Sequence, residues 1–175
     1  MLQYGIIISI VLKLVILMDI KYSLFIVLVH QGNGLFKEMV CSLMNRISQF
    51  DKSSVLKNIG KIHWLVTVDK KQYSVKMSAQ RMLLLGRTQK CACCGLKGQY
   101  FWLEHSGCLP PHFNLYGIRK RKEVLLTADH IQPRSLGGKT TQENLQLLCF
   151  TCNKAKKNLV ITLPQLRKLR GVKNA

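Results

Sequence analysis

The spacing of apolar side chains in the first part of the chain predicts one helix followed by a β-hairpin. Residues 35–60 repeat apolar positions every three or four residues, which is typical of a helix with one buried face. These apolar residues are Phe36, Met39, Val40, Leu43, Met44 and Ile47. The polar stretch 51–54 interrupts the repeat. Residues 64–68 and 73–75 then predict two short strands, joined by the polar turn 69–72.

The remainder of the chain predicts more strands than helices, so the expected fold class is α+β. Strands are expected over residues 100–103, 113–116, 124–127 and 144–148, with a basic turn at 119–122. The prolines at 110–111 indicate a loop. The expected helices are one capped by Ser78, one over residues 152–158 with Thr151 near its cap, and one from Thr162 through Arg170.

The first 34 residues form an apolar extension unlike the rest of the chain. Residues 6–18 and 23–29 are almost wholly apolar. The charges in this stretch are Lys13, Asp19 and Lys21. The apolar side chains favour membrane insertion by about 5–10 kcal/mol, and the three charges oppose it by about 8–10 kcal/mol. A membrane span is therefore an alternative that we do not favour, beside buried strands or a dispensable extension.

A turn signal, Gly-Asn-Gly at residues 32–34, marks the end of this extension. We expect residues 1–34 to form the extension and residues 35–80 an accessory segment with a helix and short strands. Residues 81–175 are then the working domain. No charged region precedes the apolar run, so a secretory signal is not expected and the protein is not predicted to be secreted.

Basic residues outnumber acidic ones, and the excess is concentrated in the last segment. The formal net charge is +19, from 27 Lys and Arg against 8 Asp and Glu. Residues 81–175 hold 17 basic and 4 acidic side chains, a net of +13. A field of this size favours a polyanionic partner over a small-molecule substrate. DNA is the expected partner, RNA is the alternative, and no oligomeric state is predicted.

Two Cys-x-x-Cys pairs enclose the central part of this segment. They are Cys91 with Cys94, and Cys149 with Cys152. Four thiolates in two such pairs suit a tetrahedral structural zinc ion. Gly95 favours Cys94 over Cys93 as the second ligand, because glycine permits the positive φ of a tight turn, and Cys93 stays the alternative.

The cysteine count also predicts the compartment. An odd number, seven, and the Cys-x-x-Cys spacing favour zinc over disulfides in a reducing compartment, either the cytoplasm or an organelle interior. The cysteines outside the pairs are Cys41, Cys93 and Cys108. His105, Cys108 and His112 match no firm metal-site spacing, and we expect them to be structural or loop residues.

Polar residues stand at the ends of the elements predicted between the cysteine pairs and just after them. Asp129 and His130 end one expected strand, Asn144 opens the next, and Asn153 follows the last cysteine. Carboxylate and amide oxygens bind hard divalent cations, and histidine takes a proton from water near neutral pH. This order of strand, loop, strand and helix predicts a hydrolytic cation site.

The same residues resemble the HNH endonucleases, in the branch with four zinc-binding cysteines. The similar stretches read Asp-His-Ile-Gln-Pro-Arg-Ser-Leu-Gly-Gly over residues 129–138 and Asn-Leu-Gln-Leu-Leu-Cys-Phe-Thr-Cys-Asn over 144–153, followed by Lys156. The resemblance covers Cys91 to about Lys157. It implies a ββα-metal core, here held together by the four-cysteine zinc site, that hydrolyses phosphodiester bonds with a divalent cation.

The resemblance implies a role for each matched position. His130 corresponds to the general base, and Asp129 and Asn153 to ligands of the catalytic cation. Asn144 corresponds to a residue that positions the loop and the histidine. Because Asn153 offers an amide oxygen and not an imidazole, the expected cation is Mg²⁺ or Mn²⁺. The basic residues expected to contact nucleic acid are Lys156, Lys157, Arg134 and Lys139.

The expected function is therefore a metal-dependent HNH endonuclease that acts on DNA. The alternative is a zinc-dependent nucleic-acid-binding module without cleavage activity. The presence of all four family positions, from Asp129 to Asn153, favours the enzyme.

Overall fold

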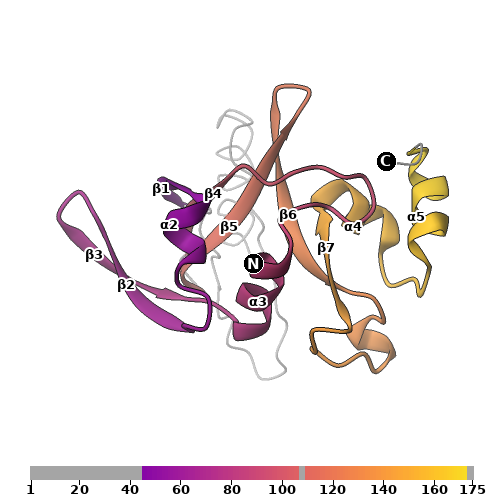
Figure 1. Ribbon diagram of the computed structural model, residues 1–175, viewed down its shortest axis with the longest axis horizontal. Helices are drawn as coiled ribbons and strands as arrows, with labels where there is room; N and C mark the ends of the chain where they lie inside the picture. Colours follow the sequence, from indigo (N-terminus) through magenta and orange to yellow (C-terminus); the bar gives the residue numbers. More distant parts are fainter. Residues whose placement is uncertain (1–44, 107–108, 173–175) are drawn as a thin grey trace, which may run out of the picture. The chain divides into compact units, whose positions relative to one another are not determined.

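The computed structural model describes residues 45–106 and 109–172, apart from the side chain of Ser106 (Figure 1). Its strands are β1 (Asn45–Asp51), β2 (His63–Val68), β3 (Lys71–Lys76), β4 (Tyr100–Ser106), β5 (Leu109–Arg119), β6 (Lys122–His130) and β7 (Leu145–Cys149). Its helices are α2 (Lys52–Leu56), α3 (Ala79–Arg87), α4 (Phe150–Lys156), α5 (Leu163–Arg170) and the 3-10 helix η1 (Arg134–Leu136).

The predicted apolar extension, residues 1–34, lies outside the described residues, and so does the segment considered as a membrane span. Within the described ranges, no helix is both long enough and apolar enough to cross a membrane. The extension and the alternatives given for it therefore stay predictions.

Five strands form one sheet in the order β1-β4-β5-β6-β7, and β2 and β3 form a separate two-stranded sheet (Figure 1). β6 pairs antiparallel with both β5 and β7. This pairing places Asp129 opposite Gln146 and His130 opposite Leu145. β6, β7 and α4 follow one another as strand, strand and helix, so the expected α+β class and ββα core are both confirmed.

Both predicted hairpins are confirmed, and each closes through a two-residue turn with positive φ. Asp69 and Lys70 have φ values of 48° and 65°, and Lys120 and Arg121 have values of 49° and 63°. Two-residue turns of this kind match the right-handed twist of the strands that they join. The strands are longer than predicted, because cross-strand pairing continues past the apolar positions that mark a strand in the sequence.

The helix predicted over residues 35–60 is wrong in most of its described part. Residues 45–51 form β1, at the edge of the five-stranded sheet, and only Lys52–Leu56 is helical. A bulge changes the register of β1 against β4, so Ile47 and Phe50 are both partly buried although they are three residues apart. A bulged strand has thus produced the spacing of a helix. Residues 35–44 lie outside the described residues.

Two smaller predictions are wrong and two are confirmed. The prolines at 110–111 are not in a loop but among the first residues of β5, where a missing N–H is tolerated. Thr151 does not cap α4, because the helix begins two residues earlier than predicted, at Phe150, and its N-cap is Cys149. The caps predicted at Ser78 and Thr162 are present, and Thr162 forms a complete capping box.

One hydrophobic core joins both sides of the predicted boundary at residue 80. Val75 of β3 and Met82 of α3 are both buried in it. Phe113 of β5 contacts the rings of Phe50 and Trp64, at centroid distances of 5.2 and 6.0 Å. The β2–β3 hairpin and β1 therefore pack onto the same core as the working domain, and the division at residue 80 stays a prediction.

Candidate metal centre and active-site cleft

The first cysteine pair lies in a tight turn between α3 and β4. The N–H of Cys91 donates to the carbonyl of Leu96, and the N–H of Gly95 donates to the carbonyl of Cys91, both at 2.9 Å. Gly95 has a φ of +70°, the conformation for which glycine was expected here. Gly117 of β5 lies against this turn, since any side chain there would collide with the carbonyl of Lys97. These contacts hold the turn against the sheet.

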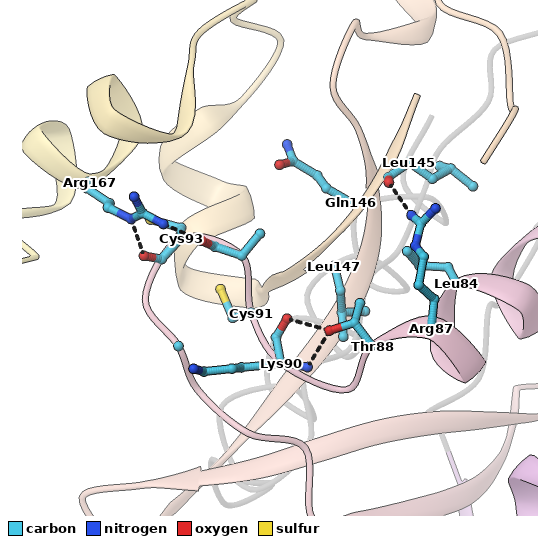
Figure 2. Close-up of a pocket in the computed structure, with 12 residues that line it drawn as sticks. Leu84, Arg87, Thr88, Lys90, Cys91, Cys93, Leu145, Gln146, Leu147 and Arg167 are labelled. Atoms are coloured by element: carbon cyan, nitrogen blue, oxygen red, sulfur yellow. Dashed lines mark hydrogen bonds between the residues drawn. The ribbon is translucent and has the colours of Figure 1, made fainter. Parts of the chain in front are cut away.

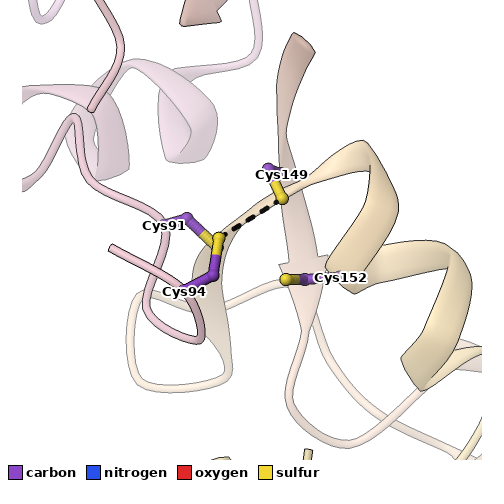
Figure 3. Close-up of side chains that lie close together, drawn as sticks. All are labelled: Cys91, Cys94, Cys149 and Cys152. Atoms are coloured by element: carbon purple, nitrogen blue, oxygen red, sulfur yellow. Dashed lines mark hydrogen bonds between the residues drawn. The ribbon is translucent and has the colours of Figure 1, made fainter. Parts of the chain in front are cut away.

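The second cysteine pair comes from the end of β7 and the first turn of α4, and it meets the first pair (Figure 3). The sulfurs of the four cysteines all lie within 4.8 Å of one another. The sulfurs of Cys94 and Cys149 are 3.6 Å apart. The group that can hold a metal ion is Cys91, Cys94, Cys149 and Cys152, and it does not include Cys93.

The four thiols differ in how readily they ionise. Burial raises the pKa of Cys94, but N–H donation by Leu96 and the guanidinium of Arg119, 2.7 Å from the sulfur, outweigh it and lower the pKa to about 6. The hydrogen bond with Cys149 is the main reason why the pKa of Cys91 is raised to about 11. Four thiols at these distances do not all ionise by themselves, whereas a divalent metal ion displaces their protons.

Two arginines that the sequence analysis did not single out fasten α5 to the first cysteine turn and α3 to the start of β7 (Figure 2). Arg167 of α5 donates to the carbonyls of Cys93 and Ala92, at 3.0 Å each. Arg87 of α3 donates to the carbonyl of Leu145 in β7, at 3.1 Å. A cavity of about 310 Å³ lies between these residues and the first cysteine turn. Nothing in the sequence near Arg87 or Arg167 indicates these carbonyl partners, since the partners are distant in the chain.

A separate cleft of about 350 Å³ gathers most of the residues predicted for catalysis. Asp129 and His130 come from the end of β6, and Asn153 comes from α4. Two of the predicted nucleic-acid contacts, Arg134 and Lys157, also line it. Further lining residues are Ala128, Pro133, Ser135 and Asn158. The cleft thus combines a carboxylate, an imidazole and an amide with two exposed basic side chains.

Asp129 is held by two side chains and keeps one oxygen atom accessible to a ligand. Its Oδ2 accepts from Gln146 Nε2 at 2.9 Å and lies 3.2 Å from the ammonium of Lys156. The ammonium also donates to the carbonyl of His130, at 2.8 Å. Oδ1 of Asp129 has no hydrogen-bond partner among the described residues, so it is the atom through which Asp129 would hold a cation.

Lys156 is therefore not the surface side chain that the sequence suggested. Its side chain is 1% exposed, between Asp129 and the backbone of His130. Helical spacing placed Lys156 on the same face as Asn153, and that face turns out to pack against β6 instead of facing solvent. Direct phosphate contact by Lys156 is excluded by this burial, whereas Lys157 and Lys139 are exposed.

His130 and Asn153 each have one end fixed by a threonine. His130 Nε2 lies 2.8 Å from the hydroxyl of Thr140, a residue that the sequence analysis did not identify. Asn153 donates through Nδ2 to the hydroxyl of Thr127, at 3.0 Å, and Thr127 in turn donates to the carbonyl of Leu148. In the tautomer in which Nε2 donates to Thr140, Nδ1 of His130 keeps a lone pair, and the Oδ1 of Asn153 is the atom that could hold a cation.

Asn144 lies outside the cleft and fastens the loop between β6 and β7. Its Oδ1 accepts from the N–H of Gln132, at 2.8 Å. Its Nδ2 donates to the carbonyls of Gln132 and Lys139, at 3.1 and 2.8 Å. These bonds bridge the loop that carries Thr140, the partner of His130. They agree with the expectation that Asn144 positions this loop, and that role stays a prediction.

Replacing Lys156 with methionine is expected to lower the free energy of unfolding by about 3–5 kcal/mol, because the buried carboxylate of Asp129 then lacks the ammonium group that neutralises it. Urea unfolding without added divalent cations measures the change. Lys154→Met is the control, since Lys154 is exposed on the same helix and should change stability by at most about 0.5 kcal/mol. Equal losses in the two variants would contradict a structural ion pair at Asp129.

Part of the chain matches a known family. Residues 117–159 match the family model described as HNH endonuclease, a range that holds β6, β7 and α4. Searches of curated proteins and of solved structures found no match. The match includes the four residues predicted for catalysis and the second cysteine pair, and the first cysteine pair precedes it.

Proposed function

We propose that the chain, in which residues 117–159 match the HNH endonuclease family model, is a cation-dependent endonuclease that hydrolyses phosphodiester bonds in DNA. The observation that carries the proposal is the cleft that Asp129, His130 and Asn153 all line. The net charge of +13 over residues 81–175 supports a polyanionic substrate. Arg134 and Lys157 in the cleft, with Lys139 on the adjoining loop, supply phosphate contacts.

His130 acts as the general base in this proposal. Histidine ionises near neutral pH, so its neutral form accepts a proton from the attacking water. The hydroxyl of Thr140 at Nε2 holds the ring and leaves Nδ1 to take that proton. Asn144 supports the arrangement indirectly, because it closes the loop on which Thr140 lies.

Asp129 and Asn153 hold the catalytic cation. The free Oδ1 of each side chain is a hard oxygen donor, which suits Mg²⁺ or Mn²⁺ and disfavours soft ions. A divalent cation bound there supplies positive charge where the phosphate and the leaving oxygen become more negative. The bonds from Gln146 to Asp129 and from Asn153 to Thr127 orient the two side chains before any cation binds.

The four-cysteine centre holds a structural zinc ion. Sulfurs bound to zinc at about 2.3 Å in a tetrahedron lie about 3.8 Å apart, and the 3.6 Å between Cys94 and Cys149 fits this geometry. The donor set is four soft sulfurs with no open position, which is typical of a structural site. Cys152 and Asn153 are neighbours on α4, so zinc fixes the helix that carries the proposed cation ligand.

One observation favours the alternative, a zinc-dependent nucleic-acid-binding module that does not cut. The carboxylate of Asp129 is already paired with the buried ammonium of Lys156, which lowers its attraction for a cation. The partnerless Oδ1 of Asp129 and the cleft beside it favour the enzyme. The two functions differ in one measurable property, which is cleavage.

Incubation of the full chain with supercoiled plasmid and a series of divalent cations tests the proposal. We expect strand cleavage with Mg²⁺ or Mn²⁺ and none without an added divalent cation. A gel-shift measurement on the same preparation shows whether DNA is bound. A chain that binds DNA but cuts with no cation would be the non-cleaving module, and a chain that does neither would refute DNA as the substrate.

A further inference from the structure

The turn between β5 and β6 carries long, charged side chains at two backbone positions that disfavour long side chains. Lys120 and Arg121 have φ values of 49° and 63°, in the left-handed region. Asparagine and glycine are the residues preferred in such two-residue hairpin turns, because a larger side chain is strained there. Arg119 and Lys122, which pair across the ladder next to the turn, are basic as well. The turn and its two flanking positions therefore place four basic side chains in succession, residues 119–122, at the end of the hairpin.

The charge at this hairpin tip is not neutralised by the rest of the described structure. Lys120, Arg121 and Lys122 are exposed, and none of the ion pairs among the described residues includes them. Glu123 is the adjacent acid, and its carboxylate is already bound by Arg46 at 2.6 Å. It also accepts from Tyr100 and Trp102, so it has little capacity left to attract the tip lysines.

The tip is also held firmly at its base. Arg119 donates to the sulfur of Cys94, at 2.7 Å, so the last residue of β5 is tied to the metal centre. The β5–β6 ladder pairs every residue from Leu115–Leu126 to Arg119–Lys122. A cationic tip on a rigid ladder loses little conformational freedom when it binds an anion.

The β2–β3 hairpin shows that the backbone conformation does not require this charge. Its turn residues, Asp69 and Lys70, also have positive φ. Their charges are opposite and cancel, whereas Lys120 and Arg121 add up to two positive charges. The two turns therefore have the same backbone conformation and differ in net charge.

We propose that the β5–β6 tip, residues 120–122, binds phosphates of the duplex DNA backbone outside the cleft that holds Asp129, His130 and Asn153. The proposal rests on the proposed function for its class of substrate. Phosphate contacts of this kind hold a protein on the duplex and set its orientation without reading sequence. The tip thus orients the duplex for the cleft and strengthens binding to all sequences alike.

The test replaces the charge with the residues that the turn prefers, in the double variant Lys120→Asn with Arg121→Gly. We expect the melting temperature to stay the same or rise by about 2–4 °C, because the strain is relieved. We expect duplex binding to weaken for every sequence tested. The plot of the logarithm of the binding constant against the logarithm of the salt concentration should become less steep, its negative slope losing about 2 in magnitude. Binding is measured by fluorescence anisotropy without added divalent cations, so that cleavage does not interfere.

Two control variants separate the tip from general effects. Asp69→Asn with Lys70→Gly places the same two residues, Asn and Gly, in the β2–β3 turn without changing the net charge, so DNA binding should not change. Lys57→Gln with Lys61→Gln removes two exposed charges elsewhere, so it reports the loss of net charge alone. A salt slope for the tip variant equal to that of either control would overturn the proposal.

The outcome is independent of catalysis. If wild-type protein binds duplex DNA and the tip variant lowers the salt slope by about 2, the tip contacts phosphates whether or not the chain cuts. If wild-type protein cuts plasmid and the tip variant binds with the wild-type slope, the proposed function stands and the tip proposal is wrong.

Discussion

Replacing His130 with alanine is expected to slow plasmid cleavage by about 10²–10⁴-fold, the contribution usual for a general base, while DNA binding is retained. The side chain is half-buried at the end of β6, and its ring is hydrogen-bonded to the exposed Thr140. Its loss therefore leaves the core intact and removes the group placed to take a proton from water. Initial rates of supercoil loss with saturating Mg²⁺ measure the change.

His63→Ala is the matched control, because His63 is exposed on β2 and belongs to no proposed site. It should cut at the wild-type rate. Thr140→Val keeps the imidazole but removes the hydroxyl that holds it, so an intermediate rate is expected. A wild-type rate in His130→Ala would show that another group activates the water, even if the chain is a nuclease.

Replacing Cys149 with serine is expected to unfold the domain at ordinary temperatures. Binding of a structural zinc ion contributes about 10–16 kcal/mol in small zinc domains, and the whole stability of a domain is about 5–15 kcal/mol. Cys149 ends β7 and is fully buried, so without zinc the variant also leaves a polar hydroxyl in the core. Circular dichroism melting measures the loss of folded structure, and the zinc content per chain measures the loss of the metal ion. Cys91→Ser should behave in the same way.

Cys93→Ala separates the metal centre from the surrounding core. Cys93 is as buried as Cys91, but its sulfur is not in the group of four. This variant should fold, melt cooperatively and retain one zinc ion per chain. Equal melting temperatures and zinc contents for the Cys93, Cys91 and Cys149 variants would contradict the assignment of the four ligands.

The candidate site shows where sequence reasoning succeeds and where it stops. The pairing of Cys91 with Cys94, the turn at Gly95 and the strand that ends at His130 depend on residues close together in the chain, and the structure has each of them. Thr140 could not be identified in this way. Its contact with His130 depends on how the loop between β6 and β7 folds, and hydrogen bonds between Asn144 and the backbone of Gln132 and Lys139 bridge that loop.

The residues of β1 show the same limit for the fold. Ile47 and Phe50 have the spacing of a helix, and only the pairing of β1 with β4, with its bulge, makes them part of a sheet. A local pattern of apolar positions does not reveal hydrogen bonds to a strand that is distant in the chain. In β1 these bonds to β4 outweigh the helical spacing of the apolar residues.

Residue types and spacing were enough to predict the α+β class, the two hairpins, the four cysteines of the metal centre and the candidate catalytic residues Asp129, His130 and Asn153. Each depends on local spacing or on a short motif whose chemistry is readable from residue types. The burial of Lys156 against Asp129, which removes it as a surface contact for phosphate, is visible only in the folded chain. Burial and charge pairing depend on which face of α4 packs against β6, and that is set by the packing of the whole core.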